Sequence, residues 1–171
     1  MRGELTIGDR VKLDAKDKKI LEQLQLNARQ SIAQIAKKTS LPRDVVVYRI
    51  KKLEKSNVIR RHHTSLNPSK LGYPLYAYVT FACYNLEPKQ EEAFIKYLVA
   101  QQNTVYVAKT SGNYDFTIGV CARDYREYDS IITEIRRRFI RVIKDIATQF
   151  TIQEYKFDWM TDLISESNNK N

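Results

Sequence analysis

The sequence predicts an α+β protein made of two domains: a helical N-terminal domain and a C-terminal domain in which strands and helices alternate. The 171 residues leave room for two small domains that each bury a core. Apolar residues recur at helical spacing in the first third of the chain, and strand and helix patterns alternate after it. The charge is divided too, because residues 1–70 carry 17 Lys and Arg against 7 Asp and Glu, and the remainder carries 12 against 13. This asymmetry indicates either a polyanion-binding domain joined to a nearly neutral one or a merely soluble basic surface.

Composition excludes several classes of protein. Hydrophobic residues make up 43% and charged residues 29% of the chain, with five Gly and four Pro, which is typical of a globular protein. No apolar run approaches the ~18 residues of a membrane span, and the first residues lack the apolar core of a signal peptide. Two cysteines are too few for a disulfide scaffold or a four-ligand zinc site. We therefore expect a cytoplasmic protein with no metal, no cofactor and no membrane partner.

Three helices are expected in the N-terminal domain. Asp14 can cap the first helix, and Asp17 adds negative charge to its first turn. The second helix begins at Ser31, which has capping-box spacing with Gln34, and ends near Thr39. Apolar stripes support both helices: Ile20, Leu21 and Leu24 in the first, and Ile32, Ile35 and Ala36 in the second.

The third helix is expected from Pro42 to about Ser56. Proline suits the first helical position because its missing N–H would have no partner there, and Asn57 can end the helix in left-handed geometry. At about 100° per residue, one face is apolar and the opposite face is basic and aromatic. The apolar face holds Val46, Ile50 and Leu53, and the opposite face holds Asp44, Tyr48, Lys51, Lys52 and Lys55.

The C-terminal domain is predicted to have the order βαββαβ. Two copies of one unit in this order point to a ferredoxin-like domain, with an antiparallel sheet backed by two helices. Strands are expected over residues 75–84, 105–109, 116–122 and 143–157, helices over 88–100 and 125–139, and an extended segment over 59–66. The predicted division is residues 1–66 for the first domain, a linker at 67–74, the second domain at 75–159 and a tail at 160–171.

A short second helix, a tight turn and a basic third helix are typical of a helix-turn-helix, winged-helix-like DNA-binding domain. The DNA major groove admits one helix, which a partner helix holds against the backbone. Phosphate contacts are predicted for Lys51, Lys52, Lys55, Arg60 and Arg61, and base-edge contacts for Arg43, Asp44, Val47 and Tyr48. The alternative is a three-helix unit whose charged face meets only water. The division of charge favours DNA binding.

Short motifs run in continuous register across residues 13–157. They are Leu13-Asp14 with Asp17, Ile20-Leu21, Leu26-Asn27-Ala28-Arg29, Ile32-Ala33-Gln34-Ile35-Ala36, Arg49-Ile50-Lys51-Lys52-Leu53-Glu54, Val58-Ile59, Leu66-Asn67-Pro68, Leu71-Gly72 and Ser111-Gly112-Asn113-Tyr114-Asp115. Together they resemble the Lrp/AsnC (leucine-responsive, feast/famine) family of transcriptional regulators. The resemblance implies sequence-specific binding of double-stranded DNA by a homodimer or a higher assembly such as an octamer, at the prokaryotic nucleoid.

The resemblance also implies site residues. Arg49 matches the family's recognition-helix arginine. In many members the second domain binds a free amino acid between subunits, and Gly112 and Asp115 match the turn that helps to form that site. Weaker candidates come from the same turn and from the last strand: Ser111, Asn113, Thr148 and Gln149. The effector could also be another small molecule.

Three positions carry specific expectations. Pro42-Arg43-Asp44 stands where the family commonly has Ser or Thr, which points to a different target sequence. Gly112 is expected to need a positive φ, which glycine adopts without strain. Asp115 could bind the ammonium group of an amino acid, or it could be a turn residue that accepts backbone hydrogen bonds.

The histidines and cysteines have simpler explanations. His62 and His63 are adjacent in an extended segment, so they point to opposite faces and cannot chelate one metal well; a pH-sensitive phosphate contact is the alternative. Cys83 and Cys121 are expected to end neighbouring parallel strands, which would allow a disulfide. Reduced, buried thiols are the favoured interpretation.

Two other functions compete with DNA-binding regulation. One is a sirohaem-decarboxylase-like enzyme of the same architecture, in which Arg60, Arg61, His62 and His63 would contact a carboxylated tetrapyrrole. The sequence contains no Ser-His-Asp set, metal cluster or phosphate loop, so we expect a protein that is not an enzyme. The other is a sensor that has lost its affinity for DNA.

Overall fold

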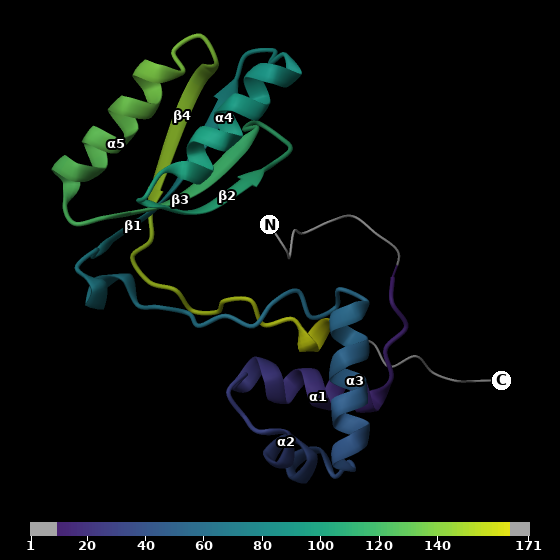
Figure 1. The fold of residues 1–171 in the computed structure, drawn as a ribbon. Helices are drawn as coiled ribbons and strands as arrows, with labels where there is room; N and C mark the ends of the chain where they lie inside the picture. The colour runs from purple at the N-terminus through teal and green to yellow at the C-terminus, as the bar shows by residue number, and fades with distance from the viewer. Residues whose placement is uncertain (1–9, 165–171) are drawn as a thin grey trace. The chain divides into compact units, whose positions relative to one another are not determined.

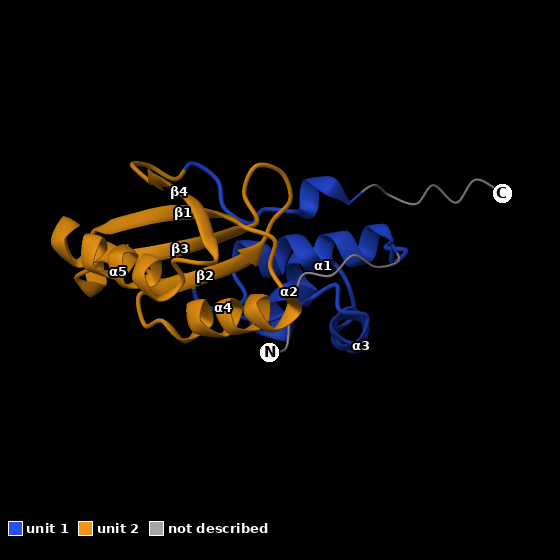
Figure 2. Ribbon diagram, turned by 90° about the horizontal axis from the view of Figure 1, so that it is seen from above, with its two compact units in different colours: residues 1–64, 155–171 blue, residues 65–154 orange. Residues whose placement is uncertain are grey.

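The computed structural model of the protein describes residues 10–164, which form two compact units (Figures 1 and 2). Within this range, unit 1 consists of residues 10–64 together with residues 155–164, and unit 2 consists of residues 65–154. No helix in this range is long and apolar enough to cross a membrane. We refer to residues 155–164 as the C-terminal strap. The predicted start of a tail at residue 160 falls inside this strap, and residues 165–171 lie outside the described range.

Unit 1 contains the three predicted helices: α1 (Ala15–Leu26), α2 (Ile32–Thr39) and α3 (Arg43–Lys55). Both predicted caps are confirmed, because Asp14 and Asp17 form a capping box at α1 and Ser31 and Gln34 form one at α2. Ser40 turns into the left-handed region (φ 56°) and ends α2. The helices pack around a cluster of buried apolar side chains: Ile20, Ile35, Ala36 and Val46.

The α3 helix begins one residue later than predicted, because Pro42 is its N-cap and not its first helical residue. Asn57 has the expected left-handed conformation just beyond the helix (φ 57°). Residues 59–66, the expected extended segment, belong to no helix or strand. A 3₁₀ turn, η1 (Pro68–Leu71), follows in the predicted linker, where the Asn67 side chain caps it.

Unit 2 has the predicted βαββαβ order. Its elements are β1 (Leu75–Cys83), α4 (Pro88–Ala100), β2 (Thr104–Lys109), β3 (Phe116–Ala122), α5 (Tyr125–Arg138) and β4 (Ile143–Phe150). The four strands form one antiparallel sheet with the order β2-β3-β1-β4. Both helices cover the same face of this sheet (Figure 1). A large core lies between the two layers and includes Phe81, Phe94, Phe116, Ile118 and Ile135.

The last strand ends seven residues earlier than predicted. Its ladder with β1 stops at the Ala77–Phe150 pair, and Thr151 N–H then donates to the Tyr76 carbonyl at 2.8 Å. Because β1 starts at Leu75, no neighbour remains to extend the strand. The following residues leave unit 2, and the strap, including its 3₁₀ turn η2 (Thr161–Leu163), belongs to unit 1. Residues 155–159, predicted to end the second domain, therefore pack elsewhere.

The expected proximity of Cys83 and Cys121 was also wrong. The strands β1 and β3 are antiparallel, and Cys121 pairs with Tyr76, seven residues along β1 from Cys83. At about 3.3 Å per residue the two thiols are separated by roughly 23 Å, so they cannot form a disulfide with each other. Both cysteines are free. Burial, with the Asp115 carboxylate nearby, raises the pKa of Cys83 to about 11, and burial also raises that of Cys121.

Candidate nucleic-acid interface and effector region

The α3 helix has one face in the core of unit 1 and one face in solvent. Val46 and Leu53 are buried, and Ile50 packs against the buried cluster. The opposite face carries the side chains predicted to contact DNA. Those exposed on or just after the helix are Arg43, Asp44, Tyr48, Lys51, Lys52, Lys55, Arg60 and Arg61, whereas Val47 is half-buried at the flank.

This exposed face of α3 is cationic, and its lysines can pair with an external anion. Among the described residues, no ion pair engages Lys51, Lys52 or Lys55. The acidic neighbour Glu54 instead contacts His62, whose Nε2 lies 3.1 Å from its carboxylate. Tyr48 adds an aromatic ring that is 68% exposed. A helix of this kind presents positive charge to phosphates and a side chain long enough to reach base edges.

Arg49 lies on a different side of α3 and has partners within unit 1. Its Nη1 donates to Asp14 Oδ1 at 2.8 Å and to Asp17 Oδ1 at 2.7 Å. The Arg49 side chain is 18% exposed and that of Asp17 is 2% exposed. Partial burial opposes ionisation of Asp14, but the Asp17 backbone N–H and the Arg49 guanidinium outweigh it and lower the pKa of Asp14. Arg49 therefore fastens α3 to the N-terminus of α1, and its contact with DNA stays a prediction.

In unit 2, the turn between β2 and β3 holds the first group of predicted effector residues. Ser111, Gly112 and Asn113 are exposed at its tip. Gly112 has a φ of +121°, which confirms the expected positive φ. Hydrogen bonds close the turn, since Thr110 N–H donates to the Asp115 carbonyl and the Thr110 hydroxyl donates to the Tyr114 carbonyl.

Asp115 anchors this turn to β1. Its backbone N–H donates to the Phe81 carbonyl at 2.8 Å, and its Oδ2 accepts a hydrogen bond from Cys83 N–H at 2.7 Å. Asp115 thus accepts a backbone hydrogen bond, as the turn interpretation expects, and its contact with the ammonium group of an effector stays a prediction. Tyr114, in the same turn, was not predicted as a site residue, and its hydroxyl donates to Asp145 on β4 at 3.4 Å.

The second group of predicted effector residues lies on β4. Thr148 pairs with Val79 and Gln149 with Tyr78, so these two side chains point to opposite faces of the sheet. Thr148 shares a hydrogen bond with the Tyr128 hydroxyl of α5, whereas Gln149 is on the face without helices. Since β3 and β4 flank β1 on opposite sides, they are about 10 Å apart. One protomer therefore does not bring the turn and the two β4 residues into a single pocket.

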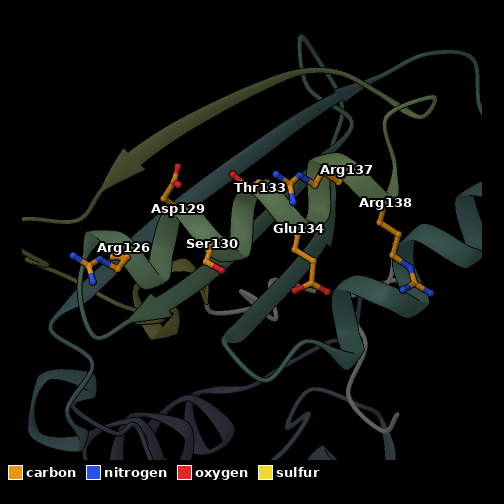
Figure 3. Close-up of a pocket in the computed structure, with 7 residues that line it drawn as sticks. All are labelled: Arg126, Asp129, Ser130, Thr133, Glu134, Arg137 and Arg138. Atoms are coloured by element: carbon orange, nitrogen blue, oxygen red, sulfur yellow. The ribbon is translucent and has the colours of Figure 1, made fainter.

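A shallow depression runs along the outer surface of α5 (Figure 3). All seven residues that line it come from this one helix: Arg126, Asp129, Ser130, Thr133, Glu134, Arg137 and Arg138. None of them is a predicted effector residue. Glu134 accepts a hydrogen bond from the Tyr97 hydroxyl at 2.8 Å, and the Arg138 guanidinium lies 4.8 Å from the centre of the Tyr97 ring. These contacts join α5 to α4 and are explained by packing within unit 2.

The face of the sheet without helices carries a group of tyrosines. Tyr76 and Tyr78 alternate along β1 with the buried Ala77 and Val79, so they point away from the helices. The rings of Tyr76 and Tyr78 are 5.4 Å apart, and those of Tyr78 and Tyr106 are 6.4 Å apart. Gly119 lies beneath them, where an added Cβ would meet the Tyr76 hydroxyl at 2.8 Å. We call Tyr76, Tyr78 and Tyr106 the tyrosine face.

His62 and His63 are exposed. Among residues 10–164, no group of three or more His, Cys, Asp or Glu side chains could hold a metal ion.

Comparison with known proteins defines the class to which this fold and basic helix belong. Residues 13–60 match the winged helix-turn-helix DNA-binding family, and residues 77–159 match the Lrp/AsnC ligand binding domain. The protein is a helix-turn-helix transcriptional regulator with a DNA-binding domain and a domain for a small effector. It belongs to the Lrp/AsnC family.

A relative supports this assignment, and solved structures share the fold. The chain is 30% identical to the leucine-responsive regulatory protein of Haemophilus influenzae over 144 residues, which cover 84% of this chain and 86% of that protein. The crystal structure of an AsnC family transcriptional regulator from Agrobacterium tumefaciens matches with a TM-score of 0.78 and 24% identity, covering 90% of this chain and 100% of that one. A transcriptional regulator of Neisseria meningitidis, solved in complex with L-Met, has a TM-score of 0.78 and 19% identity, covering 89% and 99%.

Proposed function

We propose that a homodimer of this regulator inserts α3 of each copy into the major groove of double-stranded DNA. The observation that carries the proposal is the exposed face of α3, where Lys51, Lys52 and Lys55 have no carboxylate partner among the described residues. These lysines, with Arg60 and Arg61, would neutralise phosphates. We expect this regulator in the cytoplasm at the nucleoid, because its proposed target is chromosomal DNA.

Sequence preference would come from the first two turns of α3. Arg43, Asp44, Val47 and Tyr48 lie there, near the end of the helix that reaches base edges in helix-turn-helix complexes. Tyr48 is the most suitable reader because its ring is large and 68% exposed. Asp44 repels phosphate, so its natural partner would be the amino group of a cytosine. We propose that Arg49 supports the position of α3 from within unit 1, because it already binds two carboxylates.

The second copy would pack against the tyrosine face. This face is the side of the sheet that α4 and α5 leave bare, and on it three tyrosines above Gly119 contact one another edge to face. Aromatic residues are enriched at the centres of protein interfaces. Two sheets that pack face to face would also explain why Val105 and Tyr106 on the edge strand β2 are about half-exposed in one chain.

The effector would be a free amino acid bound where two copies meet. The relatives include a glutamate uptake regulatory protein and a leucine-responsive regulatory protein, and one neighbour was solved with L-Met. In this chain the residues proposed for the site are Ser111, Gly112, Asn113, Asp115, Thr148 and Gln149. One protomer keeps them in two groups on opposite sides of β1, so a partner would have to complete the pocket.

We also propose that the protein is not an enzyme. For the sirohaem-decarboxylase alternative, Arg61, His62 and His63 lie on an irregular exposed segment, and His62 is already paired with Glu54. Incubation with a carboxylated tetrapyrrole separates the two functions. A shifted Soret band with loss of carboxyl groups would support the enzyme, whereas an unchanged spectrum beside DNA binding supports the regulator.

The proposed function is tested by selecting bound duplexes from random DNA, with and without a mixture of the twenty amino acids. We expect enrichment of a two-fold symmetric sequence whose half-sites are about one or more helical turns (~34 Å) apart. An amino-acid effect on the selected pool would support the effector site. Failure to enrich any sequence, with affinity that does not depend on salt, would contradict the proposal.

A further inference from the structure

The chain passes between the two units twice. It leaves unit 1 after residue 64, forms the whole of unit 2, and returns to unit 1 at residue 155. Figure 2 shows the returning strap in the colour of unit 1. The DNA-binding unit is therefore joined to the sheet by two covalent connections, one before β1 and one after β4. Two connections restrict the orientation of a unit far more than one does.

The strap is attached to α1 by a single amide side chain that uses both of its ends. Gln25 Nε2 donates to the Asp158 carbonyl at 2.6 Å. Gln25 Oε1 accepts from Met160 N–H at 3.0 Å and from Thr161 N–H at 3.1 Å. Asp158 has a left-handed conformation (φ 51°), and this turns its carbonyl and the two following donors toward one acceptor-donor pair. These three hydrogen bonds between one glutamine side chain and the strap backbone hold the strap against α1.

Burial supports the same conclusion. Thr161 is 2% exposed although it lies near the end of the described chain, and η2 packs against α1. Leu21, one turn before Gln25 on the same face of α1, is 9% exposed but is not part of the three-helix cluster. In contrast, the first residue of the strap and the segment before it are open, since Tyr155 is 88% exposed and Ile152 is 98% exposed. The strap is thus docked at its far end and free along its approach.

The strap lies outside both buried clusters. Neither the buried cluster of unit 1 nor that of unit 2 contains a residue from 155–164. The strap begins at residue 155, six residues after Gln149. Thr148 and Gln149 lie on β4, where an effector site is proposed. A segment that lies outside both buried clusters and connects β4 to α1 is suited to transmit the state of the sheet to the DNA-binding unit.

We infer that Gln25 is a positioning residue and that the strap it holds, as a second connection, limits the range of orientations open to the DNA-binding unit relative to the sheet. This inference rests on the proposed function. With the strap docked, the two α3 helices of a dimer would be confined to a narrower range of separations, so that affinity would depend steeply on the spacing of the half-sites. When the strap is released, each DNA-binding unit is joined to its sheet by one flexible connection. The dimer can then bind half-sites at many spacings.

The test uses full-length Gln25→Leu and the double variant Gln25→Leu/Thr161→Glu, in which a buried threonine becomes a carboxylate that cannot stay docked. Gln102→Leu is the matched control, because the Gln102 side chain is exposed and makes no hydrogen bond to any of residues 10–164. Hydrogen exchange at the Met160 and Thr161 amides reports release of the strap without DNA. Affinity is then measured for a single selected half-site and for pairs of half-sites whose spacing changes in single base pairs.

For the wild type and for Gln102→Leu, we expect affinity to change by about tenfold when the spacing shifts by half a helical turn. For the double variant we expect less than about threefold, with affinity for a single half-site unchanged within twofold and faster exchange at residues 160–161. An unaltered spacing dependence in the double variant, with exchange accelerated, would overturn the inference alone. Absence of DNA binding by the wild type would overturn the proposed function and the inference with it.

Discussion

The two units of this regulator differ in how completely one chain builds their sites. In unit 1, one helix carries the proposed DNA contacts, and the same unit supplies the core and the ion pair that hold this helix. In unit 2, the proposed effector residues fall into two groups on opposite sides of β1, and the tyrosine face is left bare. One chain can carry a complete binding surface for a long ligand such as DNA. A pocket for a small molecule must instead surround the ligand on several sides. This difference suggests that effector binding and dimer formation are linked.

The largest effect is expected for Arg49→Ala, which tests whether unit 1 is self-sufficient. The substitution leaves the nearly buried Asp17 carboxylate without its cation, so the free energy of unfolding should fall by about 3 kcal/mol. Urea denaturation measures this loss, and Lys52→Ala is the surface control, with a change within about 0.5 kcal/mol. If stability were unchanged while DNA affinity collapsed, Arg49 would be a direct DNA contact instead.

The next effect concerns DNA affinity and separates the two units. Lys51→Ala/Lys52→Ala should weaken binding to all sequences by tenfold or more, and should reduce the slope of log K against log salt by about 1.8. The matched control is Lys89→Ala/Lys96→Ala on α4, where two exposed lysines of unit 2 are lost. Fluorescence anisotropy at several salt concentrations gives both quantities. Equal losses for the two variants would mean that unit 2 shares the DNA surface.

A smaller effect is expected for Gly112→Ala in unit 2. Gly112 has a φ of +121° and nothing within 4 Å of an added Cβ, so the cost is backbone strain and not a steric clash. We expect the free energy of unfolding to fall by about 1–2 kcal/mol, measured by urea denaturation. Ser111→Ala, the neighbouring exposed residue, should have little effect. Unchanged stability and oligomeric state in Gly112→Ala would show that the turn does not need glycine.

The smallest effect is on the pH dependence of stability. The pKa of Asp14 in the folded protein lies below its ordinary value of 3.8, because backbone N–H groups and Arg49 outweigh the effect of partial burial. Its contribution is therefore complete above pH 3.8 and is lost as the pH falls through the lower, folded-state value. Unfolding measured between pH 5 and pH 2 should show a steeper loss for the wild type than for Asp14→Asn. Parallel curves would show that Asp14 does not contribute to the pH dependence of stability.

Local signals in the sequence predicted most of the elements, because caps and periodicity act within a few residues. The capping boxes at Asp14 and Ser31 and the helix Pro88–Ala100 are examples. The features that were missed depend on residues far apart in the chain. Arg49 meets Asp14 across 35 positions, and Gln25 meets Asp158 across 133. The end of β4 at Phe150 likewise depends on where its partner β1 begins, which no property of residues 143–157 reveals.

In the candidate sites, too, the features set by nearby residues were predicted and those set by distant residues were not. The exposed basic face of α3 could be predicted because helical periodicity alone assigns its residues to one side. The turn at Gly112 could be predicted from its residue types, but its separation from Thr148 and Gln149 depends on strand order. Periodicity places Thr148 and Gln149 on opposite faces once they are in a strand, yet only the order β3-β1-β4 puts β1 between them and Asp115.

The most direct test of the account is lysine footprinting of the full-length protein on a selected DNA duplex. Acetylation is followed by mass spectrometry with and without DNA. The account predicts that Lys51, Lys52 and Lys55 become protected while Lys89 and Lys96 react as before. Protection of the α4 lysines, with the three α3 lysines still fully reactive, would contradict it.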